Sequence, residues 1–499
     1  MVHSVLDALD AHAAMQPNAL AFDDVPYGVV CDASLRVAAK LHDAGLKPRD
    51  RLAIYSENRP GFVYAYLGGL RAGAIVVTVN VLYRTSDLEH VLTDADPSVV
   101  CVSEQSAQYV RPRAGRAVVD LADVERWAHD ATIMPLADPP AIHAGDGAIL
   151  IYTSGTTGRS KGAMLTHCNL AAIASALVEA WHWTANDTLL LTLPLFHVHG
   201  LGAGLNGTLV AGGRVLVRER FDAPAVVAAL ANGEATMFFG VPTMYVRILE
   251  NAGEGVRFDR VRLFVSGSAA LPASVHEEFD RRFGVSILER YGSTEFGFAL
   301  SNRYDAARHA GTVGFPLPRV EVRLADPVSG ADVAPSAAGE ILVHGPNVFK
   351  GYWRNEAATD RAFVRDAQGR RWYKSGDLAT FHPERGYVIN GRLKELVISG
   401  GFNVYPIEVE DELLRLPGIR AAAVVGQPDP ARGEIPVAFL ETDASFDAEQ
   451  TLATLRERLA SFKVPKHLYP IDALPRNAMG KVEKPRLREL LAKPSPDSE

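Results

Sequence analysis

Short apolar runs rich in β-branched residues recur through the first 300 residues, and segments with a helical spacing of apolar positions separate them. The runs are LAIYS from Leu52, AIVVTV from Ala74, SVVCVS from Ser98, RVLVRE from Arg214, TMFFGV from Thr236 and VRLFVSG from Val261. Strands that are apolar at nearly every position are buried on both faces, and the alternating helices cover them, as in parallel sheets. The pattern therefore predicts an α/β fold with parallel-type sheets.

The pattern of apolar runs in the sequence changes after residue 311. Between residues 311 and 391 the apolar runs VEVRLAD, GEILVHG and GYVING are shorter and are punctuated by Gly and Pro, which is typical of a small antiparallel β subdomain. A compact segment follows residue 391, with expected strands near Ala422 and Val437 and an expected helix at 449–461. A chain of 499 residues has room for two to four domains of about 100 to 200 residues each.

Composition excludes several classes of protein. The net charge is −8, so the chain does not have the excess of basic residues that is typical of nucleic-acid-binding proteins. No apolar run reaches the roughly 18 residues of a membrane span. The cysteines Cys31, Cys101 and Cys168 are too scattered for a disulfide framework, and Asp7 and Asp10 interrupt the region where a signal peptide would be apolar. We expect a cytoplasmic protein with no membrane span and no nucleic-acid partner.

A segment of small and hydroxylated residues, Tyr152-Thr-Ser-Gly-Thr-Thr-Gly-Arg-Ser-Lys-Gly162, follows the apolar run AILIY directly. Glycines let several backbone N–H groups converge on an anion, while hydroxyls add donors and a lysine adds positive charge. The candidate phosphate-binding residues are Thr153, Ser154, Gly155, Thr156, Thr157, Gly158 and Lys161. The glycine spacing differs from that of a Walker A loop. The alternative is a flexible surface turn, but the position after a buried strand favours a phosphate-binding loop.

The loop TSGTTGRSKG resembles the signature of the adenylate-forming superfamily, which contains acyl-coenzyme A (CoA) synthetases, peptide-synthetase adenylation domains and firefly luciferase. Four more segments of the family pattern occur in order: YGSTE at 291–295, YKSGD at 373–377, GRLKELVISGGFNVYPIE at 391–408 and PRNAMGK at 475–481. The resemblance covers nearly the whole chain. It implies a large N-terminal domain (1–393) of two parallel-type αβ subdomains plus a small β subdomain, and a smaller, mobile α+β C-terminal domain (394–499).

The resemblance also implies a two-step reaction. A carboxylate attacks ATP to give an acyl adenylate and pyrophosphate, and the thiol of CoA then displaces AMP. Charge that builds on the α-phosphate must be neutralised. By resemblance, Thr156 and Glu295 hold Mg²⁺, Thr294 donates to the α-phosphate, and Lys481 contacts both the attacking carboxylate and the phosphate. The alternative for Lys481 is a solvated surface lysine.

The remaining nucleotide and thiol contacts come from the same resemblance. The implied nucleotide-binding residues are Gly267, Ser268, Tyr291, Asp377 and Arg392. Among these, Asp377 accepts from the ribose hydroxyls with Arg392 beside it, whereas a plain strand-to-helix turn would explain 267–268 almost as well. Lys394 lies at the position of the family hinge, about which rotation brings Gly400 and Gly401 toward the CoA thiol.

The superfamily motifs leave the acid unspecified, so other residues must select it. A dicarboxylate needs a cation for its second carboxylate, and the basic candidates are His197, His199, Arg247 and Arg290. Their segments, with ERYG and AGTVGFPLP, resemble malonyl-CoA synthetases. That resemblance implies that Arg247 binds the distal carboxylate with help from Arg290, and that His197 lies near the acyl and nucleotide sites. The alternatives are a surface ion pair for Arg247 and a core histidine for His199.

Four positions depart from the family patterns. Ser160 replaces the usual loop proline and Glu395 the commoner aspartate, while Ser293 and Phe296 stand where malonate-type relatives more often carry Met and a small polar residue. Methylmalonate or another short acid is therefore an alternative substrate. The alternatives are a ligase for a short-chain, medium-chain or aryl monocarboxylic acid, and a non-catalytic nucleotide-binding relative. Because the sequence ends soon after Lys481, we expect no carrier domain, which disfavours a peptide-synthetase module. The sequence predicts no particular oligomeric state.

Overall fold

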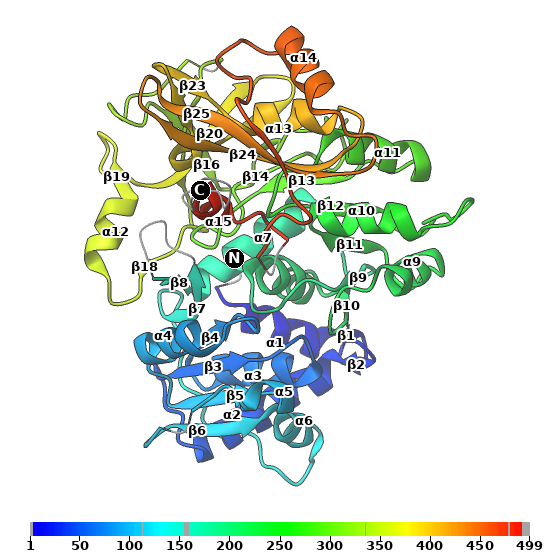
Figure 1. Cartoon of the computed structure of the whole chain (residues 1–499). Helices are drawn as coiled ribbons and strands as arrows, with labels where there is room; N and C mark the ends of the chain where they lie inside the picture. Colours follow the sequence, from blue (N-terminus) through cyan, green and yellow to red (C-terminus); the bar gives the residue numbers. More distant parts are fainter. Residues whose placement is uncertain (1–2, 112, 154–158, 335, 478–479, 492–499) are drawn as a thin grey trace.

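The computed structural model describes residues 3–111, 113–153, 159–334, 336–477 and 480–491. Among these residues the strands form four sheets, and the chain runs from a lower lobe built around the first sheets to an upper lobe near the C-terminus (Figure 1). No helix in the described ranges has the length and apolar character to cross a membrane. The predicted α/β class, with large parallel-type sheets and a smaller C-terminal part, is confirmed.

The nine-stranded sheet is parallel in its middle and antiparallel at its edges. Its strands, in spatial order, are β15 (Phe315–Pro316), β14 (Leu300–Ser301), β13 (Leu288–Tyr291), β12 (Leu263–Ser266), β11 (Met237–Gly240), β9 (Thr188–Leu191), β10 (Arg214–Val217), β1 (Leu20–Phe22) and β2 (Val25–Pro26). Residues along each central strand alternate between two apolar clusters, so both faces of the sheet are buried.

The seven-stranded sheet has the same character, with an antiparallel edge at β8 and β18. Its strands, in spatial order, are β18 (Gly351–Tyr352), β8 (Lys161–Thr166), β7 (Gly147–Thr153), β4 (Ile75–Val79), β3 (Arg51–Tyr55), β5 (Val99–Val102) and β6 (Ala117–Asp120). Leu52 and Ile54 of β3 belong to one apolar cluster, and Ala53 and Tyr55 belong to another. This strict alternation places a helical layer on each face.

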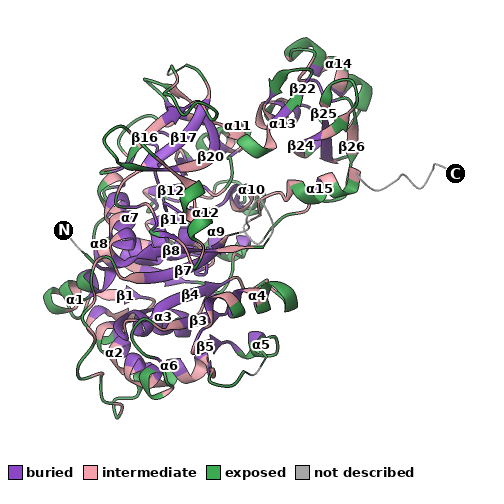
Figure 2. Ribbon diagram, turned by 90° about the vertical axis from the view of Figure 1, so that its left-hand side faces the viewer, coloured by how far each residue is buried: buried purple, intermediate pink, exposed green. Residues whose placement is uncertain are grey.

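Helices cover the two large sheets on both sides (Figures 1 and 2). The helices that contribute to the cluster between the two sheets are α1 (Val5–Met15), α2 (Tyr27–Asp43), α3 (Pro60–Arg71), α6 (Leu121–His129), α7 (His167–Ala180), the π-helical η1 (His199–Asn206) and α8 (Gly207–Ala211). The outer face of the nine-stranded sheet packs against α9 (Ala223–Ala231), α10 (Pro242–Asn251) and α11 (Ala273–Phe283). The outer face of the seven-stranded sheet packs against α4 (Thr85–Ala95), and the short α5 (Glu104–Ala107) follows β5.

The third sheet is antiparallel and corresponds to the small β subdomain expected from the sequence. Its strands are β16 (Glu321–Ala325), β17 (Gly339–His344), β20 (Arg371–His382), β19 (Phe363–Arg365) and β21 (Gly386–Arg392). The helix α12 (Glu356–Ala362) precedes β19. The chain leaves this sheet at Arg392 and passes through the 3-10 turn η2 (Leu393–Glu395).

The fourth sheet forms a lobe of its own at the C-terminal end (Figure 2). Its strands are β23 (Phe402–Val404), β22 (Val397–Ser399), β25 (Gly433–Thr442), β24 (Ile419–Asp429) and β26 (Leu468–Pro470). Helices α13 (Pro406–Leu414) and α14 (Ala448–Arg458) share one apolar cluster with this sheet, and α15 (Lys484–Leu491) shares the other.

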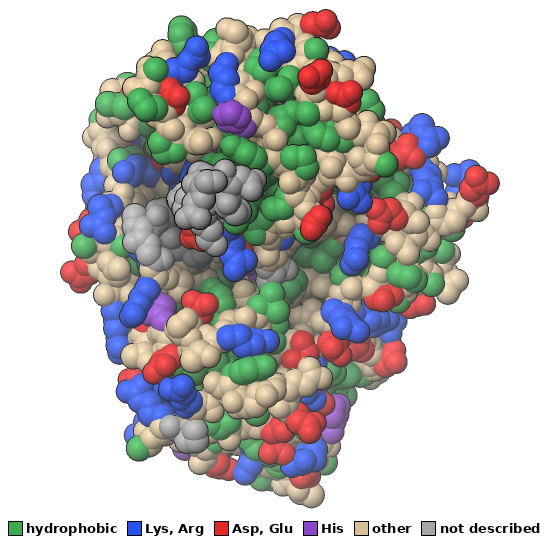
Figure 3. Space-filling model, viewed as in Figure 1, with side chains coloured by type: hydrophobic (Ala, Val, Ile, Leu, Met, Phe, Trp, Pro, Cys, Tyr) green, Lys and Arg blue, Asp and Glu red, His purple; other side chains and the backbone are tan. Residues whose placement is uncertain are grey.

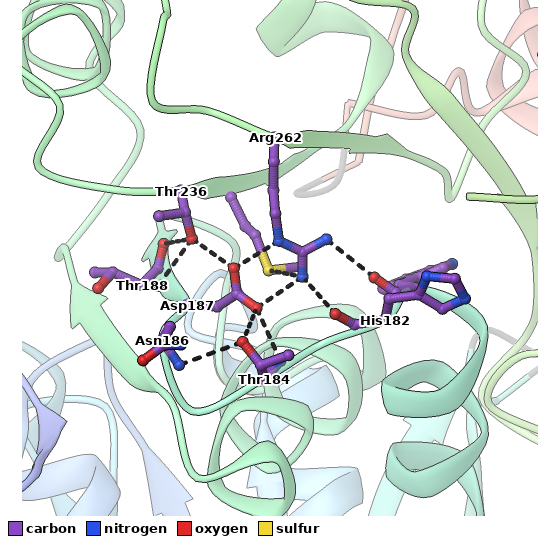
Figure 4. Close-up of polar contacts among 9 residues, drawn as sticks. His182, Thr184, Asn186, Asp187, Thr188, Thr236 and Arg262 are labelled. Carbon is purple, nitrogen blue, oxygen red and sulfur yellow. Dashed lines mark hydrogen bonds and ion pairs between the residues drawn. The ribbon is translucent and has the colours of Figure 1, made fainter. Parts of the chain in front are cut away.

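A polar cluster holds the starting ends of three neighbouring strands of the nine-stranded sheet (Figure 4). Arg262, just before β12, donates from Nε to Asp187 Oδ1 at 2.6 Å and from Nη2 to Oδ2 at 2.7 Å. Asp187 precedes β9 and also accepts from the hydroxyl of Thr236, just before β11, at 2.9 Å. The opposite, carboxyl ends of these strands are where ligands bind in sheets of this kind.

Candidate functional site

A cavity of about 430 Å³ lies between the carboxyl ends of the nine-stranded sheet and the C-terminal lobe. The space-filling view shows a hollow between the upper and lower halves of the molecule, with Lys and Arg side chains along its rim (Figure 3). The predicted site residues that line the cavity are Ser268, Arg290, Tyr291, Asp377, Arg392 and Lys481. The structure therefore brings together residues from strands β13, β20 and β21 and from the C-terminal segment.

The carboxylate of Asp377 is held at one corner of this cavity. The hydroxyl of Tyr291 donates to Oδ2 at 2.7 Å, and Nε of Arg392 lies 3.0 Å from Oδ1. The side chain of Ser375 accepts from the backbone N–H of Asp377 at 3.0 Å, which fixes the turn. A buried carboxylate in this position has lone pairs left to accept hydrogen bonds from vicinal hydroxyls, as a ribose would present.

Lys481 enters the same cavity from the C-terminal lobe. The backbone N–H of Lys481 donates to Asn477 Oδ1 at 3.1 Å, and the backbone N–H of Asn477 donates to the carbonyl oxygen of Lys481 at 2.9 Å. Gly480 has φ +72°, and a Cβ there would lie 2.9 Å from Oγ1 of Thr243 on α10. At this close approach the turn that carries Lys481 packs against helix α10. Burial, with the charge of Arg392, lowers the pKa of Lys481 to about 8.

Glu295 is positioned by two hydroxyl groups, one on each oxygen. Tyr352 donates to Oε1 at 3.0 Å and Ser293 to Oε2 at 3.0 Å. Nζ of Lys161 lies 5.4 Å from the centre of the Tyr352 ring, so the loop lysine and this carboxylate share a neighbour. Thr294, which lies between Ser293 and Glu295 in the sequence, is buried.

One carboxylate of this kind fits Mg²⁺, which is often bound by one or two carboxylates together with substrate phosphates. Within the described ranges no group of three or more His, Cys, Asp and Glu side chains could hold a metal by itself. Magnesium would therefore need phosphate oxygens beside Glu295. Thr156, its other predicted ligand, lies outside the described residues.

The described ends of the predicted phosphate-binding loop are paired strands. Thr153 ends β7 and lies opposite Lys161, which begins β8. The predicted loop residues Ser154, Gly155, Thr156, Thr157 and Gly158 lie outside the described residues.

A second polar group lies at the carboxyl end of β12. Nδ1 of His199 lies 3.3 Å from Oγ of Ser268, and Nη2 of Arg290 lies 3.5 Å from the same oxygen. Nε of Arg290 and Nε2 of His199 are both buried and have no hydrogen-bond partner among the residues that the structure describes. Burial lowers the pKa of Arg290 to about 9; burial, with the charge of Arg290, holds the pKa of His199 well below its ordinary range. These buried donors are suited to an anion.

The close approach at Gly267 makes room for this arginine. A Cβ at Gly267 would lie 2.4 Å from Cζ of Arg290, so any larger residue would displace the guanidinium. The guanidinium also lies 4.4 Å from the centre of the Phe298 ring. Gly267 thus shapes the pocket of Arg290, a role distinct from the predicted contact with the nucleotide.

The structure does not bring every predicted residue into the cavity. Arg247 is exposed on α10, whereas Thr243 and Val246 of the same helix line the cavity. His197 lines a separate cavity of about 50 Å³ beside the seven-stranded sheet. Burial, with the charge of Arg290, lowers the pKa of His197 to about 4, and its Nδ1 accepts from the backbone N–H of His199 at 3.2 Å.

The predicted hinge and thiol-side glycines also lie apart from the cavity lining. Lys394 is within η2, at the passage between the third and fourth sheets. Gly400 and Gly401 form the turn between β22 and β23, with φ of +58° and +83°. In this arrangement Lys481 lines the cavity and the two glycines do not.

Two site residues were not predicted from the sequence. Tyr352 follows Gly351 in a short aromatic segment with no recognisable pattern, and the pairing of β18 with β8, together with the backbone hydrogen bond from Phe349 to Glu295, brings it to Glu295. Glu289 lines the cavity, and burial raises its pKa to about 8. Strand alternation in LERY would have placed Glu289 and Tyr291 on one face and Arg290 on the other.

Comparison with known proteins finds relatives over nearly the whole chain. A family model described as AMP-binding enzyme matches residues 9–353, and one described as AMP-binding enzyme C-terminal domain matches residues 408–481. Feruloyl-CoA synthase of an Amycolatopsis species is 37% identical over 488 residues, covering 95% of this chain and 96% of the relative. The mitochondrial malonate–CoA ligase of Mus musculus is 36% identical over 482 residues, covering 89% and 82%. The crystal structure of ATP-bound MatB from Rhodopseudomonas palustris superposes with a TM-score of 0.89 at 37% identity, covering 98% and 99%.

Proposed function

Since the chain belongs to the AMP-binding enzyme family and is an acyl-CoA synthetase of the AMP-forming type, we propose that its acid is malonate or methylmalonate. The product would be the corresponding CoA thioester, with AMP and pyrophosphate released. ATP and CoA are substrates of this family. The proposal therefore concerns the acid and the roles of individual residues.

The unpaired, buried Arg290 carries this proposal. The residue is 5% exposed and forms no ion pair with a carboxylate of the described part of the chain, while Ser268 and His199 add two more polar groups. A buried cation without a partner is unfavourable, and a second carboxylate on the substrate would supply the missing negative charge. An acid with an apolar tail would leave the cation unpaired. Because Arg247 is exposed outside the cavity, Arg290 is the principal proposed ligand and Arg247 a secondary one.

The first half-reaction uses the residues around Asp377. We infer that Asp377 and Arg392 orient the ribose, with Ser268 and Tyr291 beside the adenine. One carboxylate oxygen of the acid attacks the α-phosphorus, and the bond to pyrophosphate breaks. Lys481 and Thr294 offset the charge that builds there, which is where oriented positive charge accelerates a reaction most. Magnesium, held by Glu295 and Thr156, would supply further positive charge to the phosphates.

The second half-reaction needs a different arrangement of the C-terminal lobe. We propose that residues 394–499 turn about Lys394 relative to residues 1–393, because Gly400 and Gly401 lie outside the cavity while Lys481 lines it. The turn would remove Lys481 and bring the glycine turn to the acyl adenylate. The CoA sulfur then attacks the acyl carbon, and the bond to AMP breaks.

A second candidate is a ligase for an aryl or other monocarboxylic acid. It is favoured by the 37% identity to feruloyl-CoA synthase over nearly the full length of both chains. Such an acid would not use the charge of Arg290.

A panel of acids tests the two candidates. With ATP, Mg²⁺ and CoA, we expect malonate or methylmalonate to give the highest kcat/KM for pyrophosphate release, and mass spectrometry to show the matching CoA thioester. A higher kcat/KM for ferulate, propionate or a medium-chain acid would refute the proposed acid. Cleavage of ATP to ADP would refute the reaction class, and ATP binding without turnover of any acid would identify a non-catalytic relative.

A further inference from the structure

Helix α4 lies beside both described ends of the predicted phosphate-binding loop, although none of the residues assigned above to the site belongs to it (Figure 1). Leu88, Val91, Leu92 and Ala95 of this helix are buried against the outer face of the seven-stranded sheet. Its position is therefore fixed by apolar packing. Two of its polar side chains, His90 and Asp94, are directed at the loop ends.

His90 binds the end that enters β8. Its Nε2 lies 2.8 Å from the carbonyl oxygen of Ser160, the residue before Lys161. Because a carbonyl oxygen only accepts, Nε2 carries the proton and donates it. The imidazole also meets the ring of Tyr152 edge-on, with 6.2 Å between the ring centres.

Asp94 binds the end that leaves β7. The hydroxyl of Tyr152 donates to Oδ2 of Asp94 at 2.5 Å, and the indole N–H of Trp353 donates to its carbonyl at 3.1 Å. The backbone N–H of Trp353 in turn donates to the carbonyl of Gly162 at 2.7 Å. A Cβ at Gly162 would lie 3.1 Å from the Tyr152 ring and 3.4 Å from Trp353 Cβ, so this glycine allows the three groups to close together.

From these contacts we propose that His90 and Asp94 are positioning residues for ATP: they hold the two ends of the loop so that Thr153 and Lys161 meet the triphosphate. The proposal rests on the ATP-dependent function proposed above. We place neither residue in contact with the reacting atoms. Their effect is to fix Tyr152 and Ser160, on either side of the loop, before ATP binds, so that less conformational entropy is lost on binding.

Paired substitutions at His90 separate the hydrogen bond from the ring contact. The variant His90→Phe keeps the ring against Tyr152 but removes the donor, whereas His90→Gln keeps a donor at a similar reach. We expect His90→Phe to weaken ATP binding, measured by calorimetry, about 3- to 10-fold, the effect of one hydrogen bond. His90→Gln should restore binding to within about 2-fold of the wild type.

The half-reactions give a second readout, which a general loss of structure would not reproduce. In His90→Phe the KM for ATP should rise while the rate of thioester formation from supplied acyl adenylate stays unchanged. The matched control is His344→Phe, because His344 Nδ1 also lies 2.8 Å from a backbone carbonyl, that of Arg371, in the third sheet. This control should leave ATP binding unaltered.

An unchanged ATP dissociation constant in His90→Phe would overturn the proposal, as would equal losses in both half-reactions. If His90→Phe does not fold, Tyr152→Phe removes the bond to Asp94 and should show the same selective loss, and its absence would be equally damaging. Calorimetry reads ATP binding without an acid. A negative acid panel therefore refutes the proposed substrate while the comparison at His90 stays decisive.

Discussion

Replacing Arg290 by Met should change stability and activity in opposite directions. Arg290 is 5% exposed, and burial lowers the pKa of its guanidinium to about 9. Since a tenfold change in proton affinity corresponds to about 1.4 kcal/mol, keeping this charge in the folded chain costs roughly 3 to 5 kcal/mol. Met has a similar length and no charge. Part of the gain is offset because the adjoining cavity admits water, so we expect the substrate-free variant to be more stable by about 1 to 2 kcal/mol.

The same substitution should abolish selective use of the dicarboxylate. Removing one partner of a buried charge pair costs about 2 to 5 kcal/mol, so kcat/KM for malonate should fall by at least about 30-fold. The kcat/KM for propionate should change by less than about 3-fold, because propionate has no second carboxylate for Arg290 to bind.

Urea denaturation and pyrophosphate release measure the two effects. In the presence of ATP, malonate should raise the unfolding free energy of the wild type and leave that of Arg290→Met nearly unchanged. The pH dependence has a defined sign. The folded pKa of Arg290 lies below its unfolded value, so the stability advantage of the variant is full below pH 9 and shrinks as pH rises through about 9.

Two results would refute this reasoning. A substrate-free Arg290→Met protein less stable than the wild type would show that the buried charge is compensated in the folded chain. Equal losses with malonate and propionate would show that Arg290 does not contact the second carboxylate. Arg247→Met distinguishes the two arginines: a larger loss of malonate use at Arg247 would return the principal role to that residue.

Two further predictions concern the lysine and the strand-anchoring cluster. Lys481→Ala should slow adenylation by at least about 100-fold and spare thioester formation from supplied acyl adenylate. In the wild type, kcat/KM for ATP should fall as pH rises through about 8, because the Lys481 ammonium loses its proton there. Lys481→Arg should remove this pH dependence, because the arginine stays charged. Asp187→Asn should lower the free energy of unfolding by about 3 kcal/mol in urea, because Arg262 loses its buried partner. Burial is the largest single influence on the Asp187 carboxyl and opposes its ionisation, but the hydrogen bonds and charge of Arg262, together with the hydrogen bonds from Thr184 and Thr236, lower its pKa overall. The stability difference should therefore shrink as pH falls through the acidic range.

The strand predictions were correct because both faces of each large sheet are buried. The runs at Leu52, Ala74 and Ser98 are β3, β4 and β5, and those at Arg214, Thr236 and Val261 are β10, β11 and β12. Apolar residues at every position of a short run are a local signal that survives without knowledge of the neighbours. The helix expected at 449–461 is α14, and the strands near Ala422 and Val437 are β24 and β25.

The order of the strands could not be predicted in the same way. The hairpin of β1 and β2 joins the nine-stranded sheet beside β10, almost 200 residues further along the chain. The short β18 leaves the region of the third sheet to pair with β8, and this pairing helps to bring Tyr352 to Glu295. Both pairings depend on long-range packing, which no local pattern of residues encodes.

The sequence by itself determined the α/β class, the strand positions and the family, since each of these follows from local residue patterns. Only the tertiary structure decided which basic residue faces the cavity. Arg247 and Arg290 are equally suitable as cations in the sequence, yet Arg247 is exposed on α10 and Arg290 is buried at the end of β13. The physical reason is that the direction of a side chain depends on which face of its helix or strand packs against the rest of the molecule, and that face is selected by contacts between distant segments.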